Sequence, residues 1–243
     1  MPLLLNKKTM EASIRFMADI WENNSKEWLD MNRERYLAEL REPMKELAET
    51  LRGPIGALHG EFDGKPKISR INNDIRFSRG MPLYKQHMWI AFGSGTAELF
   101  SVVCGSGWTA CVTTGSQKRD ELENWRRNLI DHHDLWETWT EADGYMKRFM
   151  VSVDGEYKRP LYDDIPEDVE ELVQAKRLYI YPKYVKRLPS DPIGWLVDEM
   201  AALAPLYLMM VVPPAGIVRA IRDLVSAPPM GPRSAAVFEA FGG

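Results

Sequence analysis

The feature that most constrains the fold is a block of four strand-like runs between residues 67 and 115. The runs "KISRI", "HMWIAF", "ELFSVVCG" and "WTACVTTG" are rich in apolar and β-branched residues. Glycine-containing turns such as "GSGTA" and "GSG" separate the later runs. Consecutive strands joined by short turns pair in an antiparallel manner, so this block predicts an antiparallel meander.

Helical periodicity comes before the block. Apolar residues recur at intervals of three and four over residues 9–22, which predicts an amphipathic helix. Asn24 is followed three residues later by Glu27, a variant of the capping box, and we expect a second helix to begin there. Its pattern continues past Pro43 and ends at Gly53, where a long loop to residue 66 is expected.

Helices and strands follow the block without regular alternation. Because a doubly wound sheet requires such alternation, the order predicts an α+β fold with a central, mostly antiparallel sheet flanked by helices. We expect a tail over residues 1–8, a single domain over 9–225 and a flexible C-terminal tail over 226–243. The elements expected after the block are helices over 116–130, 134–142, 164–178, 191–211 and 217–225, and strands over 145–153 and 177–185.

Composition excludes several classes of protein. A chain of 243 residues with 45% hydrophobic and 27% charged residues can bury a core and is neither disordered nor fibrous. The formal net charge of -4 provides no general attraction to nucleic acid or anionic membranes, so any anion site must be local. The two cysteines, Cys104 and Cys111, lack the paired spacing of a zinc site. We expect free buried thiols, with a disulfide between neighbouring strands as the alternative.

The most apolar stretch spans residues 195–216. It contains Asp198, Glu199 and Pro205, so it predicts a buried core helix rather than a membrane-spanning one. The first residues contain only three consecutive leucines and no cleavage-site pattern follows them. We therefore expect a cytoplasmic protein without a membrane partner.

The densest polar chemistry lies in "SRINNDIRFSRGMPLYKQH", residues 69–87. If "NDIRF" is extended, Asp74 and Arg76 point to the same face. A carboxylate can hold a guanidinium rigidly and leave its other donors for a ligand carboxylate or phosphate. We therefore expect Arg70 and Arg76 to bind an anion, with Asp74 orienting Arg76. The alternative is a solvated surface loop held by an ion pair.

Three further candidates follow the Gly80-Met81-Pro82 turn. Tyr84 and Lys85 can donate hydrogen bonds to developing negative charge, and His87 has an unperturbed pKa near 6.5, which suits proton transfer. If the turn folds them back toward Arg70 and Arg76, all five residues form one cationic pocket. We therefore assign catalytic roles to His87, Tyr84 and Lys85.

Two segments resemble a known family. "NNSKEWLDMNRERY" and the stretch over residues 69–87 are similar to the signature segments of domain-of-unknown-function family 2461, a conserved hypothetical family. The resemblance implies a single α+β domain from Met10 to about Met210, but no established reaction. This sequence departs from the family pattern at Asn73, where the family has Arg, and over residues 79–82. The matching positions are Asn23, Asn24, Trp28, Tyr36, Arg70, Asp74, Arg76, Phe77, Ser78, Tyr84, Lys85 and His87.

The resemblance also implies that the N-terminal helix and the central loop meet in space. Asn24 would then donate an amide hydrogen bond to the ligand, and Trp28 would form an aromatic wall. The structural alternatives are a helix cap for Asn24 and ordinary core packing for Trp28.

Other polar groups are weaker candidates. His59, Glu61 and Asp63 alternate in a stretch marked by Gly60 and Gly64, and we expect a flexible loop there rather than a metal site. His132-His133 lies at an expected helix junction, where capping and solvation are favoured. No motif for a dinucleotide, phosphate loop or other cofactor is present. Basic residues near Trp125 alternate with acidic ones, as on a solvated helix face, so nucleic acid is the weaker expectation.

These observations lead to one main hypothesis and two alternatives. The main one is a small-molecule enzyme or ligand-binding protein for a carboxylate- or phosphate-bearing compound. The first alternative is a non-catalytic module that binds an acidic protein partner through the same loop. The second is a tRNA- or nucleotide-handling protein that uses the same cations and Trp28.

Overall fold

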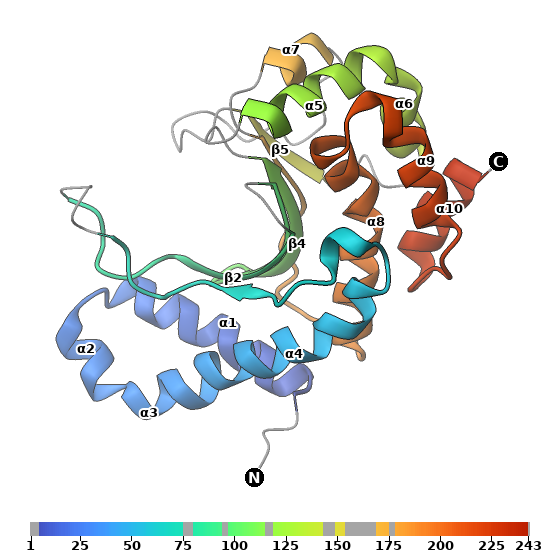
Figure 1. Ribbon diagram of the computed structural model, residues 1–243. Helices are drawn as coiled ribbons and strands as arrows, with labels where there is room; N and C mark the ends of the chain where they lie inside the picture. Colours follow the sequence, from blue (N-terminus) through green and yellow to red (C-terminus); the bar gives the residue numbers. More distant parts are fainter. Residues whose placement is uncertain are drawn as a thin grey trace.

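A computed structural model describes residues 5–74, 80–93, 97–114, 119–142, 149–153, 169–174 and 178–242. The protein has a single-domain α+β fold, as the order of elements predicted. Figure 1 shows a curved sheet with helices packed against its outer side and further helices gathered toward the C-terminus.

The sheet contains six strands in the order β1-β2-β3-β4-β6-β5 within the described residues, and every pairing is antiparallel. The first four form the predicted meander, and β6 then pairs with β4 and leaves β5 at the edge. The strands are β1 (Lys67–Ile68), β2 (His87–Phe92), β3 (Glu98–Cys104), β4 (Gly107–Thr114), β5 (Phe149–Val153) and β6 (Leu178–Pro182).

The N-terminal helices cover one end of the sheet. Helix α1 (Lys7–Glu22) contacts β3 and β4, and α4 (Glu42–Gly56) contacts β1 and β2. Between them the chain runs through α2 (Lys26–Met31), α3 (Arg33–Arg35) and the π-helix η1 (Tyr36–Arg41). Helix α4 passes the Gly53-Pro54 pair that was expected to end it, because burial of Leu51 and Ile55 favours one more helical turn.

Helix α8 (Pro192–Val211) is the central core helix, packed on β3 and β4. Among the described residues, it is the one helix that is long and apolar enough to cross a membrane, by length and composition alone. However, 83% of its apolar window is buried inside the protein, as in the core helix of a globular fold. The buried helix expected from Asp198, Glu199 and Pro205 is therefore observed.

The remaining helices pack on α8 or on one another. They are α5 (Arg119–Asp131), α6 (His133–Glu141), α7 (Val169–Gln174), α9 (Pro214–Val225) and α10 (Pro232–Gly242). Trp136 lies between Trp125 and Trp139, with ring centroids 5.8 Å apart in both pairs. The Trp139 indole N–H donates to the carbonyl of Ala202 in α8 at 2.9 Å, so this tryptophan cluster joins α5 and α6 to the core helix.

The prediction of a flexible C-terminal tail over residues 226–243 is wrong. Helix α10 buries Val237 and Phe238, and Asp198 of α8 accepts hydrogen bonds from the backbone N–H groups of Arg233 and Ser234 at 2.9 and 2.8 Å. A buried carboxylate from another helix thus caps the first turn of α10. The sequence did not reveal this helix for two reasons. The segment is rich in proline, glycine and alanine, and the residue that caps the helix lies on a distant segment. At the other terminus α1 begins at Lys7, within the tail expected over residues 1–8.

Candidate functional site

The first feature of the site is a joint between Asn24 and Tyr84. The Asn24 side-chain oxygen accepts from the Tyr84 N–H at 2.9 Å, and its amide nitrogen donates to the Tyr84 carbonyl at 3.0 Å. The cap predicted for Asn24 falls instead on Ser25, whose hydroxyl accepts from the Trp28 N–H at 3.2 Å. Both polar atoms of Asn24 are therefore engaged with the segment that leads into β2.

The side chains of Tyr84 and Trp28 lie on the helical side of the sheet. Tyr84 is buried in the main core, and burial, followed by the charges of Asp30 and Glu27, raises its pKa. Trp28 packs against Phe16 of α1, with ring centroids 5.8 Å apart. The structure therefore joins Asn24 to Tyr84, so the two segments meet as the resemblance implied, while Trp28 packs on α1.

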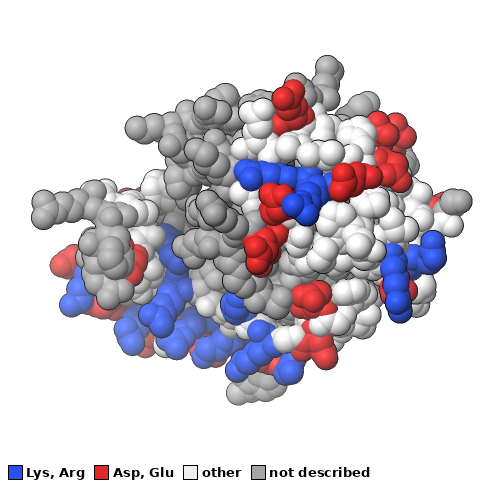
Figure 2. Space-filling view, turned by 45° about the horizontal axis from the view of Figure 1, so that its top comes forward, with Lys and Arg blue, Asp and Glu red and all other residues white. Residues whose placement is uncertain are grey.

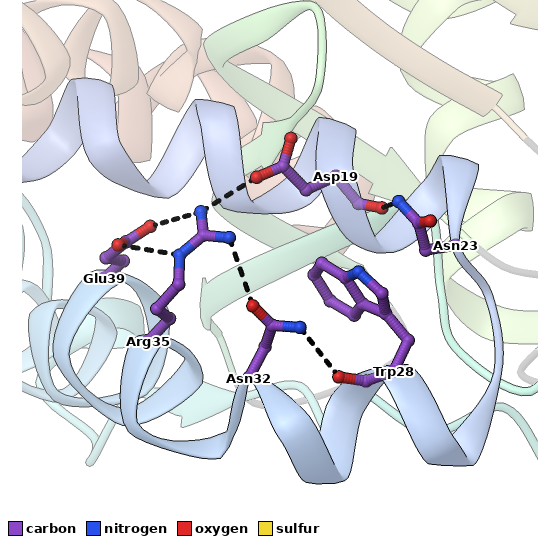
Figure 3. A network of polar contacts seen from close by, with 6 residues as sticks. All are labelled: Asp19, Asn23, Trp28, Asn32, Arg35 and Glu39. Atoms are coloured by element: carbon purple, nitrogen blue, oxygen red, sulfur yellow. Dashed lines mark hydrogen bonds and ion pairs between the residues drawn. The ribbon is translucent and has the colours of Figure 1, made fainter.

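A polar network holds the helices around Trp28 (Figure 3). The Arg35 guanidinium donates to Asp19 at 2.8 Å and to both carboxylate oxygens of Glu39 at 3.1 Å. It also donates to the side chain of Asn32 at 3.3 Å, and Asn32 donates to the Trp28 carbonyl at 2.9 Å. Sequence reasoning missed this network, although the spacing of Arg35 and Glu39 fits an ion pair along one helix face.

The second feature is an irregularity in the pairing of β1 with β2. Lys67 pairs with Ala91, and in the same register Asn72 would pair with Gln86, yet Asn72 pairs with Tyr84. The β2 side therefore carries two extra residues between these pairs, as in a β-bulge. The Ser69 hydroxyl accepts the Trp89 N–H at 3.0 Å there. Bulges re-aim side chains and are frequent beside active sites.

Three basic side chains, Arg70, Lys85 and His87, lie in or beside this bulge, and we call them the cationic corner. Burial, followed by the charge of Arg70, lowers the pKa of Lys85. Burial, followed by the charge of Lys85, lowers the pKa of His87. Within the described part of the chain, none of the three side chains makes a hydrogen bond or an ion pair. Like charges therefore meet here without a described carboxylate to neutralise them.

The third feature is the sheet face that His87 shares. His87 pairs with Cys104 and Trp89 with Val102, so these residues point to the face opposite the helices. Figure 1 shows this as the concave side of the sheet. We call its apolar cluster the aromatic face, and its described members all come from strands or from the segment after β6. They are Trp89, Ala91, Phe100, Val102, Cys111, Tyr179, Tyr181 and Tyr184.

Aromatic rings meet in pairs on this face. The ring centroids of Tyr181 and Tyr184 are 5.9 Å apart, and those of Trp89 and Phe100 are 6.5 Å apart. Burial, followed by the thiols of Cys111 and Cys104, raises the pKa of Tyr181 to about 12, and burial raises that of Tyr184 further. Both hydroxyls therefore stay protonated at neutral pH and remain hydrogen-bond donors. The sequence signal was the alternation of Tyr179 and Tyr181, which we interpreted only as strand character.

The two cysteines are free thiols and both lie on this same face. Cys104 pairs with Gly107 and Cys111 with Phe100, so the two are not opposite each other and form no disulfide. Cys104 is half-buried, whereas Cys111 is buried and its pKa is raised by burial.

The remaining predicted residues are placed as follows. Asp74 is exposed at the end of the described segment, and Arg76 lies outside the described residues, so their predicted pairing stays a prediction. The Tyr84 side chain lies in the main core with the helices, whereas His87 is on the opposite face of the sheet. The roles assigned to the six residues stay predictions; the residues are Arg70, Asp74, Arg76, Tyr84, Lys85 and His87.

The weaker candidates have local structural partners. The His59 ring accepts the Glu61 N–H at 3.3 Å in a turn, and the described residues contain no group of three side chains that could hold a metal. The His132 ring contacts the Pro214 carbonyl at 3.1 Å. On α5, Arg127 pairs with Glu123 at 2.8 Å, and Figure 2 shows basic and acidic side chains side by side over the upper part of this view.

Comparison with known families identifies one match. The model of the family described as conserved hypothetical protein (DUF2461) matches residues 12–207. This range contains the Asn24–Tyr84 joint, the cationic corner and the aromatic face, whereas α9 and α10 follow it. No curated protein matches the chain.

Proposed function

Because this chain belongs to the conserved hypothetical family DUF2461, whose description states no reaction, we propose its function from its own geometry. The protein binds an anionic small molecule, bearing a carboxylate or phosphate, at the cationic corner. In this proposal His87 transfers a proton to or from that ligand, and Arg70 and Lys85 attract and orient it.

The observation that carries this proposal is the uncompensated charge of the corner. Burial is the main cause of the lowered pKa of Lys85 and of His87, and the charge of Arg70 lowers the first further while that of Lys85 lowers the second. Such repulsion costs free energy. If the cluster had only a structural role, a neighbouring carboxylate would be expected to offset the repulsion. No described carboxylate pairs with these side chains, and a bound anion would take that place.

The three side chains differ in what they offer a ligand. Arg70 is exposed and can present a planar fork of donors to a carboxylate or phosphate. Lys85 is half-buried and acts as a point charge. His87 has a pKa below its usual value of 6.5, so the free protein holds it neutral at pH 7 and able to accept a proton.

The Asn24–Tyr84 joint supports the corner without touching the ligand in this proposal. By fixing the Tyr84 peptide groups it positions the adjacent Lys85, whose N–H donates to the Ile71 carbonyl at 2.8 Å.

Two free cysteines are also consistent with a reducing compartment, and we place the protein in the cytoplasm.

A thermal-shift titration tests the proposal. The probes are sodium phosphate and sodium acetate, compared with sodium chloride at equal ionic strength, for the wild type, Lys85→Gln and Lys8→Gln. Lys8 is an exposed lysine of α1 and serves as the matched charge control. We expect phosphate or acetate to raise the melting temperature of the wild type and Lys8→Gln but not of Lys85→Gln. Equal shifts in all three proteins would overturn the proposal.

A further inference from the structure

We infer that the anion bound at the cationic corner carries a planar aromatic ring, and that this ring lies on the aromatic face. The inference rests on the proposed function, because the corner holds the acidic group of the same molecule. It goes further by naming the chemical class of the ligand as an aromatic acid.

The cationic corner and the aromatic face are continuous with each other. His87 and Trp89 are two residues apart on β2 and point to the same face, which places them about 7 Å apart along the strand. Cys104 lies opposite His87 and Val102 opposite Trp89, about 5 Å away across the pair. An acidic group and a ring attached directly to it span a similar distance, so one small molecule can reach both surfaces.

The aromatic face presents partly exposed rings around a buried apolar centre. Its inner members Ala91, Val102 and Cys111 are buried, while Trp89, Tyr181 and Tyr184 stay half-buried. Half-buried rings offer flat or edge-on contact to another ring, a preference that saturated groups do not share. Burial keeps the Tyr181 and Tyr184 hydroxyls protonated, so neither adds a negative charge to this face.

The charges on this face also favour an anionic ligand. Glu98 is on the same face of β3, but Lys67 binds it at 3.3 Å, at the opposite end of the strand from Cys104. The described part of the aromatic face therefore presents no unpaired carboxylate beside the corner. A molecule with one anionic end and one aromatic end matches the distribution of charge and rings.

The experiment is a calorimetric titration with four probes. They are 1-naphthoate, cyclohexanecarboxylate, acetate and the neutral 1-naphthalenemethanol. We expect 1-naphthoate to bind the wild type at least about tenfold more tightly than cyclohexanecarboxylate and acetate. We expect Trp89→Leu to abolish that preference and Trp89→Phe, which retains an aromatic ring, to keep it, because Trp89 is the ring beside His87 on β2. Acetate affinity and the urea midpoint of Trp89→Leu verify that the variant is folded.

The outcomes separate this inference from the proposed function. Equal affinities for 1-naphthoate and cyclohexanecarboxylate, both lost in Lys85→Gln, would overturn the aromatic-acid inference and leave the anion site standing. Equal affinities for 1-naphthoate and 1-naphthalenemethanol, unchanged in Lys85→Gln, would overturn the anion site itself. Retention of the 1-naphthoate preference in Trp89→Leu would contradict the placement of the ring.

Discussion

Asn24 and Tyr84, 60 residues apart, are joined by a pair of hydrogen bonds in which one side-chain amide satisfies both peptide groups of one residue. Asn24 thus makes the two backbone hydrogen bonds that a neighbouring strand would make to the segment that enters β2. The joint links the N-terminal helices to the cationic corner, since Lys85 follows Tyr84 directly.

Replacing Asn24 tests the strength of this joint. Asn24→Ala leaves the Tyr84 N–H and carbonyl without their partners in a partly buried place, so we expect the free energy of unfolding to fall by about 1 to 3 kcal/mol. Urea denaturation measures it. Asn23→Ala is the control, because Asn23 makes an exposed hydrogen bond to the Asp19 carbonyl at the end of α1. An equal loss in both variants would contradict the assignment.

The pKa of His87 reports directly on the cationic corner. Lys85→Gln removes the charge that, after burial, lowers this pKa, so we expect it to rise while staying below 6.5. Nuclear magnetic resonance of the ring protons can follow it, because the chain contains four histidines. Lys8→Gln is the control and should leave the His87 pKa unchanged. An unchanged pKa in Lys85→Gln would show that the two side chains do not interact.

Lowered pKa values also predict how stability and binding depend on pH. His87 is protonated near pH 6.5 in the unfolded chain, whereas its pKa is lower in the folded protein. Its contribution to stability is therefore present above pH 6.5 and is lost as pH falls below that value.

The pKa of Lys85 lies below its usual value of 10.5, so Lys85 loses its charge as pH rises through that lowered pKa. Anion affinity should fall over the same range. Phosphate titrations across pH 7 to 10 measure it. A wild-type profile that matches Lys85→Gln would contradict the role of Lys85.

The two cysteines should differ in reactivity. Cys104 is half-buried, whereas Cys111 is buried with a raised pKa and holds little thiolate at neutral pH. We expect iodoacetamide to alkylate Cys104 at least about tenfold faster in the native protein. Peptide mass spectrometry resolves the two sites, and denatured protein provides the control in which the rates converge. Faster modification of Cys111 would contradict the described burial.

Asp198 should be the residue that holds α10 in place. Its carboxylate accepts from the N–H groups of Arg233 and Ser234 and from the Ser234 hydroxyl at 2.7 Å. Asp198→Asn turns one acceptor into a donor that faces an N–H, so we expect a loss of about 2 kcal/mol in unfolding free energy. Asp223→Asn, an exposed change, should cost less than about 0.5 kcal/mol. Amide exchange should show α10 opening first, and a stable α10 in Asp198→Asn would contradict this.

The sequence predicted the secondary structure well where one face of an element is buried. The run "HMWIAF" predicted β2, and the apolar pattern from residue 191 predicted α8, because periodicity follows directly from burial. Helix α10 was missed because its cap, Asp198, is supplied by α8. The cap predicted at Asn24 fell on Ser25 because Asn24 bonds to a segment 60 residues away.

For the site, the sequence by itself determined the chemical groups, and the two signature segments implied that the helix of Asn24 and the segment of Tyr84 meet. Only the tertiary structure decided their partners: the bulge that gathers Arg70, Lys85 and His87, and the β4–β6 pairing that brings Tyr181 to the face of Cys111. The physical reason is that periodicity records which face of an element is buried, whereas strand register and long-range hydrogen bonds depend on the whole chain packing at once.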